Sequence, residues 1–295
     1  MLITNDLISQ VRSQTDESNT DNVTDAQILE ILNRAQRKAT NIISRKYDSA
    51  FVKMTTQTTT SGTALYDIPA KASGRRIEKI EVVRGSVVWN LTQISLAKRD
   101  QFSVASQSSR PYYYSVRKNQ YEIYPDPSGG LTLNIFYLER PEKMVVQQGR
   151  IVSIDTSAGT MILDSLGTGL STTATNPGDG AYISVIDYNT GESKVNLQIS
   201  ATDSTLNQIT VKSAGLTRST VLGKTIGTAI GSDAAVDDYV CLVTGTCVPE
   251  IDEAYIDYLT QYSVVELRRR FGEPTQDDYA HLKDLEKELE KMWAG

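Results

Sequence analysis

The chain has 295 residues, 39% hydrophobic and 22% charged, which is enough for one large domain or two modest ones with an ample core. A net charge of −6 argues against a protein that coats nucleic acid through a basic face, although it allows a ring with an acidic lumen through which DNA slides. One histidine and two cysteines exclude a multi-histidine metal site within one chain and a disulfide framework.

The N-terminal part has helical patterns. Residues 2–12 predict a short helix and residues 13–23 a polar loop. Thr24 then begins a strong helix that reaches about residue 48, with Gln27 at the capping-box position and apolar residues at spacings of three and four. Such an amphipathic helix must bury its apolar stripe against another element.

From residue 51 the apolar period changes to two, which indicates β-strands. Residues 92–105 interrupt this pattern and predict a short helix that Thr92 caps. A hairpin follows, with strands at 112–116 and 120–124, and the Pro- and Gly-rich stretch 125–130 ends it. The segment 51–148 therefore predicts an antiparallel β core that carries one short helix.

Residues 149–247 differ in texture, because Gly, Thr, Ser and Asp turns separate short apolar runs at a spacing typical of a small sandwich or barrel. We interpret this segment as an inserted β domain with Gly149 and Gly245 as hinges. Few contacts with the rest of the chain are expected, which would make the segment separable.

Helical patterns return after Pro249 and continue to about residue 293, with stop signals at residues 272–274. The helices at the two chain ends have no other helical partners of similar size, so we expect residues 1–50 and 248–295 to form one bundle. The sequence thus predicts an α+β fold. The residues expected to pack in the bundle are Ile28, Leu32, Ala35, Ile42, Tyr255, Leu259, Tyr262, Leu282 and Leu289.

No set of residues suggests catalysis. His281 lies among charged residues of the last predicted helix, and Gly223-Lys224-Thr225 lacks the earlier glycine of a phosphate-binding loop. Local carboxylate pairs are explained by turns and helix starts. We therefore expect no enzyme, no cofactor and no metal. No apolar run approaches the ~20 residues of a membrane span, and the start lacks a signal peptide, so synthesis in the cytoplasm is expected.

Tyrosine is over-represented, with 15 Tyr against 4 Phe and 2 Trp. Tyrosine suits surfaces that become buried against another subunit, but half-exposed strands also favour it. An arginine triplet ends the first C-terminal helix, where it could contact a partner or simply complement the helix dipole. The candidate partner contacts are Tyr112, Tyr113, Tyr114, Arg268, Arg269 and Arg270.

Several motifs together resemble one family. They are Asp25-x-x-Ile28-Leu29-x-x-Leu32-Asn33-x-Ala35, Tyr66-Asp67-Ile68-Pro69 followed by Arg75-Arg76-Ile77, Leu96-Ala97-Lys98-Arg99-Asp100-Gln101-Phe102, Pro111-Tyr112-Tyr113-Tyr114, Tyr121-Glu122-Ile123-Tyr124-Pro125-Asp126-Pro127, and Pro249-Glu250-Ile251 before two helices. This arrangement resembles the head-to-tail connectors of tailed bacteriophages, the adaptor or tail tubular protein A-like family. It covers about residues 20–145 and 248–293, and the segment 149–245 departs from it.

The resemblance implies a structural virion protein of the neck or tail. Such an adaptor forms a ring, commonly of twelve copies, under the portal protein, binds a tail or nozzle protein, and continues the channel through which DNA passes without sequence-specific binding. A closed ring needs two different faces on each subunit. The alternatives are a carbohydrate- or receptor-binding tail module, suggested by the Tyr-rich strands and the inserted β domain, and a tail chaperone absent from the virion.

Overall fold

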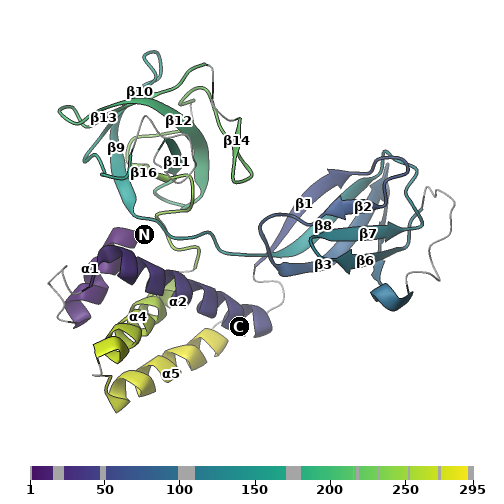
Figure 1. Cartoon of the computed structure of the whole chain (residues 1–295), viewed down its shortest axis with the longest axis horizontal. Helices are drawn as coiled ribbons and strands as arrows, with labels where there is room; N and C mark the ends of the chain where they lie inside the picture. The colour runs from purple at the N-terminus through teal and green to yellow at the C-terminus, as the bar shows by residue number, and fades with distance from the viewer. Residues whose placement is uncertain are drawn as a thin grey trace. The chain divides into compact units, whose positions relative to one another are not determined.

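The computed structural model of the chain describes residues 2–15, 23–46, 51–98, 110–170, 181–214, 216, 219–231, 233–251, 253–271 and 274–291. The fold is α+β, with helices and antiparallel strands in several sheets (Figure 1). The chain forms two compact units. Unit 1 combines Met1–Ile43 with Pro141–Gly295, and unit 2 is Ser44–Arg140.

The helices of unit 1 are α1 (Thr4–Thr15), α2 (Asp25–Lys46), α4 (Ile256–Phe271) and α5 (Gln276–Lys291), with a 3-10 turn η2 (Glu253–Tyr255) before α4. The predicted capping box of α2 is confirmed. The Thr24 amide donates to Gln27 Oε1 at 3.0 Å, and the Gln27 amide donates to Thr24 Oγ1 at 3.3 Å. The helix expected to restart near Glu250 begins only at Ile256, because the preceding residues form the tighter turn.

Helices from both chain ends contact each other in unit 1. α4 contacts both α1 and α5. Lys38 Nζ of α2 lies 2.6 Å from Glu286 Oε1 of α5 and 5.1 Å from the ring centre of Tyr262 in α4. Arg268 of α4 donates to Asp278 Oδ1 of α5 at 2.7 Å and to the Gln14 carbonyl at 2.8 Å. Polar contacts at the margins thus accompany the apolar packing between these helices.

Unit 2 contains two four-stranded sheets. The first has the order β1 (Val52–Thr58), β8 (Thr132–Glu139), β3 (Ala72–Arg84), β4 (Val87–Asn90), and all neighbours are antiparallel. The second has the order β2 (Leu65–Asp67), β7 (Gln120–Tyr124), β6 (Tyr113–Arg117), β5 (Thr92–Gln93), in which only β5 and β6 are parallel. The predicted hairpin is β6–β7.

One apolar cluster joins the two sheets of unit 2. Its buried members come from β2, β3, β6, β7 and β8, and they include Tyr66, Ile80, Val82, Tyr114, Tyr121, Ile123, Leu133 and Ile135. The rings of Tyr66 and Tyr121 stack at 5.6 Å, and the Tyr121 hydroxyl donates to Gln57 Oε1 at 2.8 Å. Burial raises the pKa of Tyr121, so its phenol stays neutral and donates that bond.

The helix expected over 92–105 does not begin at Thr92. Thr92 and Gln93 instead pair with Tyr113 and Tyr114, and only Leu96–Lys98 forms a 3-10 turn, η1. Residues 99–105 of the expected helix lie outside the described residues. Pairing with β6 offers Thr92 and Gln93 backbone partners that local helix propensity could not reveal.

The segment after residue 147 forms a closed six-stranded barrel, seen from one end in Figure 1. Its order is β10 (Thr160–Leu163), β13 (Gln208–Val211), β12 (Ser193–Asp203), β11 (Tyr182–Ile186), β16 (Tyr239–Leu242), β9 (Gln147–Asp155). A short hairpin, β14 (Thr220–Val221) and β15 (Lys224–Thr225), is a separate two-stranded sheet, and its Val221 packs with Tyr182 of β11. Of the two predicted forms, sandwich and barrel, the structure has the barrel, which leaves no open strand edge.

Three barrel hairpins use the same turn chemistry. Asp155, Asp187 and Asp203 each accept hydrogen bonds from the amides two and three residues later, at 2.7–3.3 Å. Four residues after each aspartate stands Gly159, Gly191 or Asn207, all with positive φ. Aspartate favours such turns because its carboxylate accepts hydrogen bonds from the backbone, and Gly or Asn favours them because it tolerates a positive φ.

Gly149 and Gly245 are points of close backbone approach and do not act as free hinges. A Cβ at Gly149 would collide with the Ser165 carbonyl oxygen, and one at Gly245 would collide with the Lys143 carbonyl oxygen. The barrel and the helices belong to the same compact unit. A buried cluster of Val145, Ile186, Cys241, Cys247 and Val248, with Ile3 packed on it, joins them.

We expect Gly245→Ala to lower the free energy of unfolding by about 3 kcal/mol, because the new methyl group overlaps Lys143 backbone that cannot move freely. Gly227→Ala is the matched control, since its Cβ would meet side-chain atoms no closer than 3.4 Å. Its cost should stay below about 1 kcal/mol. Urea denaturation measures both, and equal stability of the two variants would contradict this reading of Gly245.

Candidate interaction surfaces

Among the described residues, the most exposed aromatic side chain lies at one side of unit 2, where β4 leads into β5. Tyr112 is 47% exposed, and its carbonyl accepts a hydrogen bond from the Thr92 amide at 2.8 Å. The Arg110 guanidinium lies 5.5 Å from the ring centre of Trp89 and 5.6 Å from that of Tyr112. Trp89 Nε1 donates to the Pro111 carbonyl at 2.8 Å, which fixes the indole beside this group.

Val87 and Val88 of β4 are also exposed, by 54% and 53% of their surface. Val87 lies on the same face of the strand as Trp89, and Val88 lies on the opposite face. We call Val87, Val88, Trp89, Arg110 and Tyr112 the β4 surface. Tyr, Trp and Arg are enriched in protein interfaces, and charged carboxylates are depleted there. The β4 surface has that composition.

The three candidate tyrosines have different positions. Tyr112 is exposed and Tyr113 is half-buried, with their ring centres 6.4 Å apart. Tyr114 is only 2% exposed, because alternation along β6 turns its ring into the core between the sheets. Tyr114 therefore is not available to a partner in this structure, contrary to the expectation from sequence.

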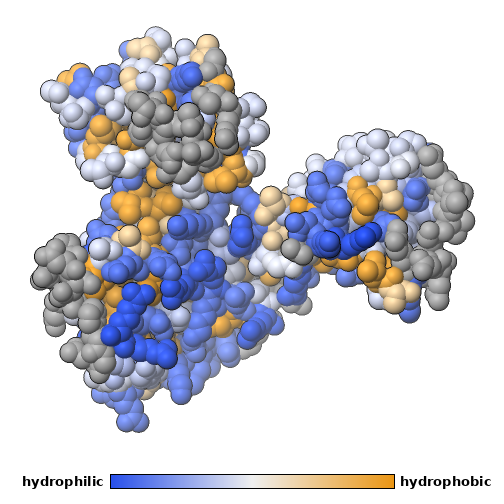
Figure 2. Space-filling view, viewed as in Figure 1, coloured by the Kyte–Doolittle hydropathy of each residue, from blue (hydrophilic) through white to orange (hydrophobic). Residues whose placement is uncertain are grey.

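The arginine triplet is likewise divided. Arg268 is engaged with Asp278 and the Gln14 carbonyl, so it ties α4 to its neighbours. The side chain of Arg269 is 69% exposed and lies 3.7 Å from Glu266, and Arg270 is also exposed. Only Arg269 and Arg270 remain as candidate contacts with an acidic partner. Figure 2 shows hydrophilic residues over most of the helical surface in that view.

Most of the predicted packing residues are buried. Seven of them have 9% or less of their surface exposed: Ile28, Leu32, Ala35, Tyr255, Leu259, Leu282 and Leu289. Ile42 and Tyr262 are half-buried, and Ile43 occupies the fully buried position beside Ile42. The helical period thus predicted positions that are mostly buried, and Ile42 and Tyr262 are the two exceptions.

Asn33 is a buried residue of α2 that is not among the predicted packing residues. It holds the segment around Met144, which leads into the barrel. Asn33 Nδ2 donates to the Met144 carbonyl at 3.0 Å, and Asn33 Oδ1 accepts from the Met144 amide at 2.8 Å. Met144 is fully buried and also bridges to Thr246. An asparagine between the apolar positions Leu32 and Ala35 was the signal in the sequence.

The contacts continue on both sides of Met144. Gln36 Nε2 donates to the Glu142 carbonyl at 2.9 Å, and Lys224 Nζ lies 2.7 Å from Glu142 Oε2. The Thr4 amide and hydroxyl both donate to the Cys247 carbonyl, at 2.8 and 2.9 Å. We call residues 141–146 and 245–248 the strap, since these two segments connect the barrel to α1 and α2.

The barrel contains a cluster of charged side chains that resembles a catalytic site but has a structural role. Lys194 Nζ lies 3.0 Å from both carboxylate oxygens of the fully buried Asp238 and 2.8 Å from Asp187. Hydrogen bonds from Lys194 and from the amides of Thr190 and Asn189 lower the pKa of Asp187 to about 2. Hydrogen bonds to the carboxylates of Asp187 and Asp238 raise the pKa of Lys194, so the amine remains charged and is no nucleophile.

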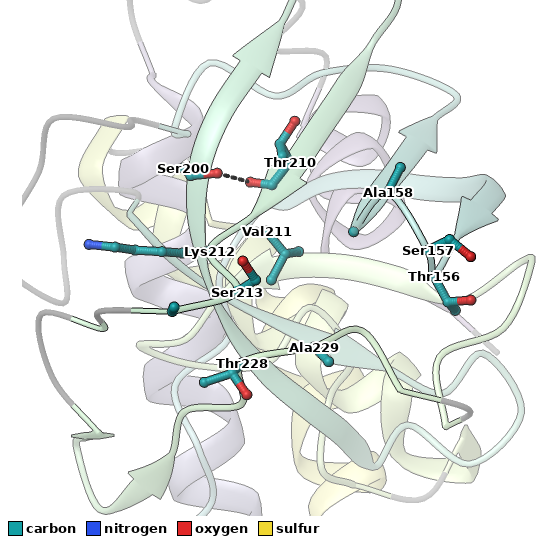
Figure 3. Close-up of a pocket in the computed structure, with 12 residues that line it drawn as sticks. Thr156, Ser157, Ala158, Ser200, Thr210, Val211, Lys212, Ser213, Thr228 and Ala229 are labelled. Atoms are coloured by element: carbon teal, nitrogen blue, oxygen red, sulfur yellow. Dashed lines mark hydrogen bonds between the residues drawn. The ribbon is translucent and has the colours of Figure 1, made fainter.

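A cleft of about 400 Å³ lies against the barrel, between the β9–β10 turn and the segments after β13 and β15. Hydroxyl groups dominate its wall, from Thr156, Ser157, Ser200, Thr210, Ser213 and Thr228. Figure 3 shows Thr156 and Ser157 on one side and Ser213 and Thr228 on another, while Lys212 extends away from them. The cleft offers hydrogen bonds to a polar ligand and no buried charge aimed into it.

Within the described ranges, no group of three or more His, Cys, Asp and Glu side chains is placed to hold a metal ion. In the same ranges no helix has both the length and the apolar character to span a membrane. Cys241 and Cys247 are free and buried.

Comparison with protein families gives one match. The family model described as SU10 adaptor protein matches residues 4–160, which include α1, α2, all of unit 2 and β9. Comparison with the curated proteins gives no match.

We expect Asn33→Ala to lower the free energy of unfolding by about 3 kcal/mol, because it leaves the buried amide and carbonyl of Met144 without partners. Arg37→Ala, on the exposed side of the same helix, is the control and should change stability by less than about 0.5 kcal/mol. Thermal denaturation checks both. A loss no larger than that of the control would show that the strap does not depend on Asn33.

Proposed function

The chain belongs to the SU10 adaptor protein family, and from this we propose that it is the head-to-tail adaptor of a tailed bacteriophage. A structural adaptor role in the virion follows from the family. The finer proposal is that copies of the chain form a ring under the portal protein, join the capsid to a tail or nozzle protein, and continue the DNA channel.

The observation that carries the proposal is the extent of the family match. It covers 4–160, and so includes the two N-terminal helices, both sheets of unit 2 and the strap residues 141–146. The remaining barrel strands and α4 and α5 lie beyond it. We infer that α1, α2, α4 and α5 act as one bundle, because Arg268 and Lys38 link helices from both chain ends.

The charge of the chain is compatible with a DNA channel. With 36 acidic and 30 basic residues, a ring of these subunits carries net negative charge. A lumen lined by acidic or neutral side chains avoids the counterion-release affinity that a basic wall gives to DNA. DNA would then pass without being held. We propose no catalytic step and no cofactor for this role.

A second candidate function is a carbohydrate-binding tail module. The hydroxyl-lined cleft of the barrel supports it, because saccharides are recognised through many hydrogen bonds. Against it stands the lack of an aromatic side chain among the described residues that line the cleft. Sugar faces commonly pack on such rings, so we rank this function below the adaptor.

Mixing the purified protein with the portal protein of its phage should produce rings of defined stoichiometry by electron microscopy. Free subunits are expected to stay monomeric, because one weak subunit contact becomes strong only when the portal holds neighbours at high effective concentration. Glycan arrays should stay blank. Tight saccharide binding without portal association would favour the second function and exclude the first.

The barrel should be dispensable for portal binding. We propose that replacing residues 150–244 by a short Gly-Ser linker leaves folded helices and unit 2, which still bind the portal. The variant should melt at a lower temperature, since Ile186 and Cys241 no longer cover Val145, Cys247 and Val248. Circular dichroism and portal pull-down test this. A soluble, folded variant that fails to bind would place the portal contact on the barrel.

A further inference from the structure

The first sheet of unit 2 has two open edges, in contrast to the closed barrel. β4 is the last strand on one side, and β1 is the last strand on the other. Among the described residues neither strand pairs with a further one. Such edges present unpaired backbone donors and acceptors that can extend the sheet to another chain.

Backbone alternation shows which residues of β4 face the open side. The Leu91 amide donates to the Ile80 carbonyl of β3, and register pairs Trp89 with Val82. In an antiparallel pair every second residue bonds to the neighbour, so Trp89 faces β3. Val88 and Asn90 therefore direct their N–H and C=O groups to the open edge.

The backbone groups of β1 alternate in the same way between β8 and the open edge. The Thr59 amide donates to the Leu131 carbonyl, and the Glu139 amide donates to the Phe51 carbonyl. The odd-numbered residues of β1 thus bond to β8. The outward groups of β1 belong to Val52, Met54, Thr56 and Thr58.

β4 lacks the features that protect sheet edges in monomeric proteins. It contains no proline and no charged residue, and both of its valines are more than half exposed. It is also part of the β4 surface, where Arg110 lies over Trp89 and Tyr112. On β1, Met54 is 54% exposed. Apolar and aromatic groups thus accompany unpaired backbone at these edges.

We propose that β4 of one subunit pairs with β1 of the next subunit in the ring. This rests on the proposed adaptor function and names the contact between its copies. Three successive antiparallel pairings make β4 antiparallel to β1 within one sheet. A neighbouring copy related by rotation about the ring axis therefore presents its β1 antiparallel to β4.

The alternation of side chains along β4 and β1 is also compatible with this pairing. Val88 pairs with Val83, which pairs with Thr132, which pairs with Thr58, so these side chains share one face. Val88 on one edge and the even-numbered residues of β1 on the other therefore combine outward backbone groups with side chains on that face. Pairing the edges continues both the hydrogen-bond ladder and the face.

The strength of the contact fits assembly on a template. Val88 and Asn90 together can form only roughly four backbone hydrogen bonds with β1. Pairing of a four-residue strand buries less surface than a stable dimer needs. A heterologous contact of this kind is weak between two free subunits and persists once the ring closes, because every subunit is then held twice.

Cysteine cross-linking on the assembled ring tests the proposal. Val88→Cys is combined in one chain with Met54→Cys, Thr56→Cys or Thr58→Cys, and rings assembled on the portal protein are oxidised. At least one combination should give a ladder of covalent oligomers on a denaturing gel. A bond within one chain is excluded, since two strands separate β4 from β1, a span of about 14 Å, and a disulfide needs Cα atoms within about 7 Å.

One double variant and one single variant are the controls. Val87→Cys combined with Thr56→Cys should give no ladder, since Val87 is equally exposed but its side chain lies on the other face. Val88→Cys alone should give no dimer, and a covalent dimer would show two-fold pairing of β4 with β4 and overturn the proposal. The native Cys241 and Cys247 are buried.

A second variant tests the backbone itself. Val88→Pro removes an N–H that points away from β3, so the melting temperature should change by only a few degrees while ring formation on the portal is lost. Rings that form normally with Val88→Pro, or that give no ladder with any of the three β1 positions, would overturn the edge pairing and leave the adaptor function standing. Failure of the unaltered protein to form rings with the portal would contradict both.

Discussion

The paired hydrogen bonds between Asn33 and Met144 are the contact on which the arrangement of unit 1 depends. Both backbone groups of a fully buried residue are satisfied by one side chain of α2. Unpaired, each group would cost about 1–3 kcal/mol. Because Met144 also bridges to Thr246, this one asparagine holds both the segment that enters the barrel and the segment that leaves it.

The barrel is therefore attached to the helices through contacts of backbone groups. Lys143 and Gly245 approach too closely for any side chain at position 245, and Thr4 of α1 donates twice to the Cys247 carbonyl. Glu142 adds Lys224 from the β14–β15 hairpin. Glycines that looked like hinges in the sequence are therefore places where chain segments pack closely, and a buried apolar cluster joins the barrel and the helices.

The two β regions solve the problem of strand edges differently. The barrel closes on itself and uses repeated Asp turns to return its strands. The sheets of unit 2 remain open, and the exposed valines, arginine and tyrosine gather at one of those open sides. This contrast agrees with a division of labour in which unit 2 offers a surface for assembly. It also fits the family match, which contains unit 2 entirely and little of the barrel.

The sequence by itself determined the helix start at Thr24, the buried helix faces, the β6–β7 hairpin and the family resemblance, because capping, periodicity and turn chemistry are local properties of the chain. Only the tertiary structure decided that Thr92 and Gln93 form a strand, that Tyr114 is internal while Tyr112 is exposed, and that Arg268 serves the helices. Each depends on a partner distant in the chain: β6 for Thr92, the facing sheet for Tyr114, and Asp278 and Gln14 for Arg268. The role of Asn33 is of the same kind, since its partner Met144 is 111 residues away and no local pattern connects them.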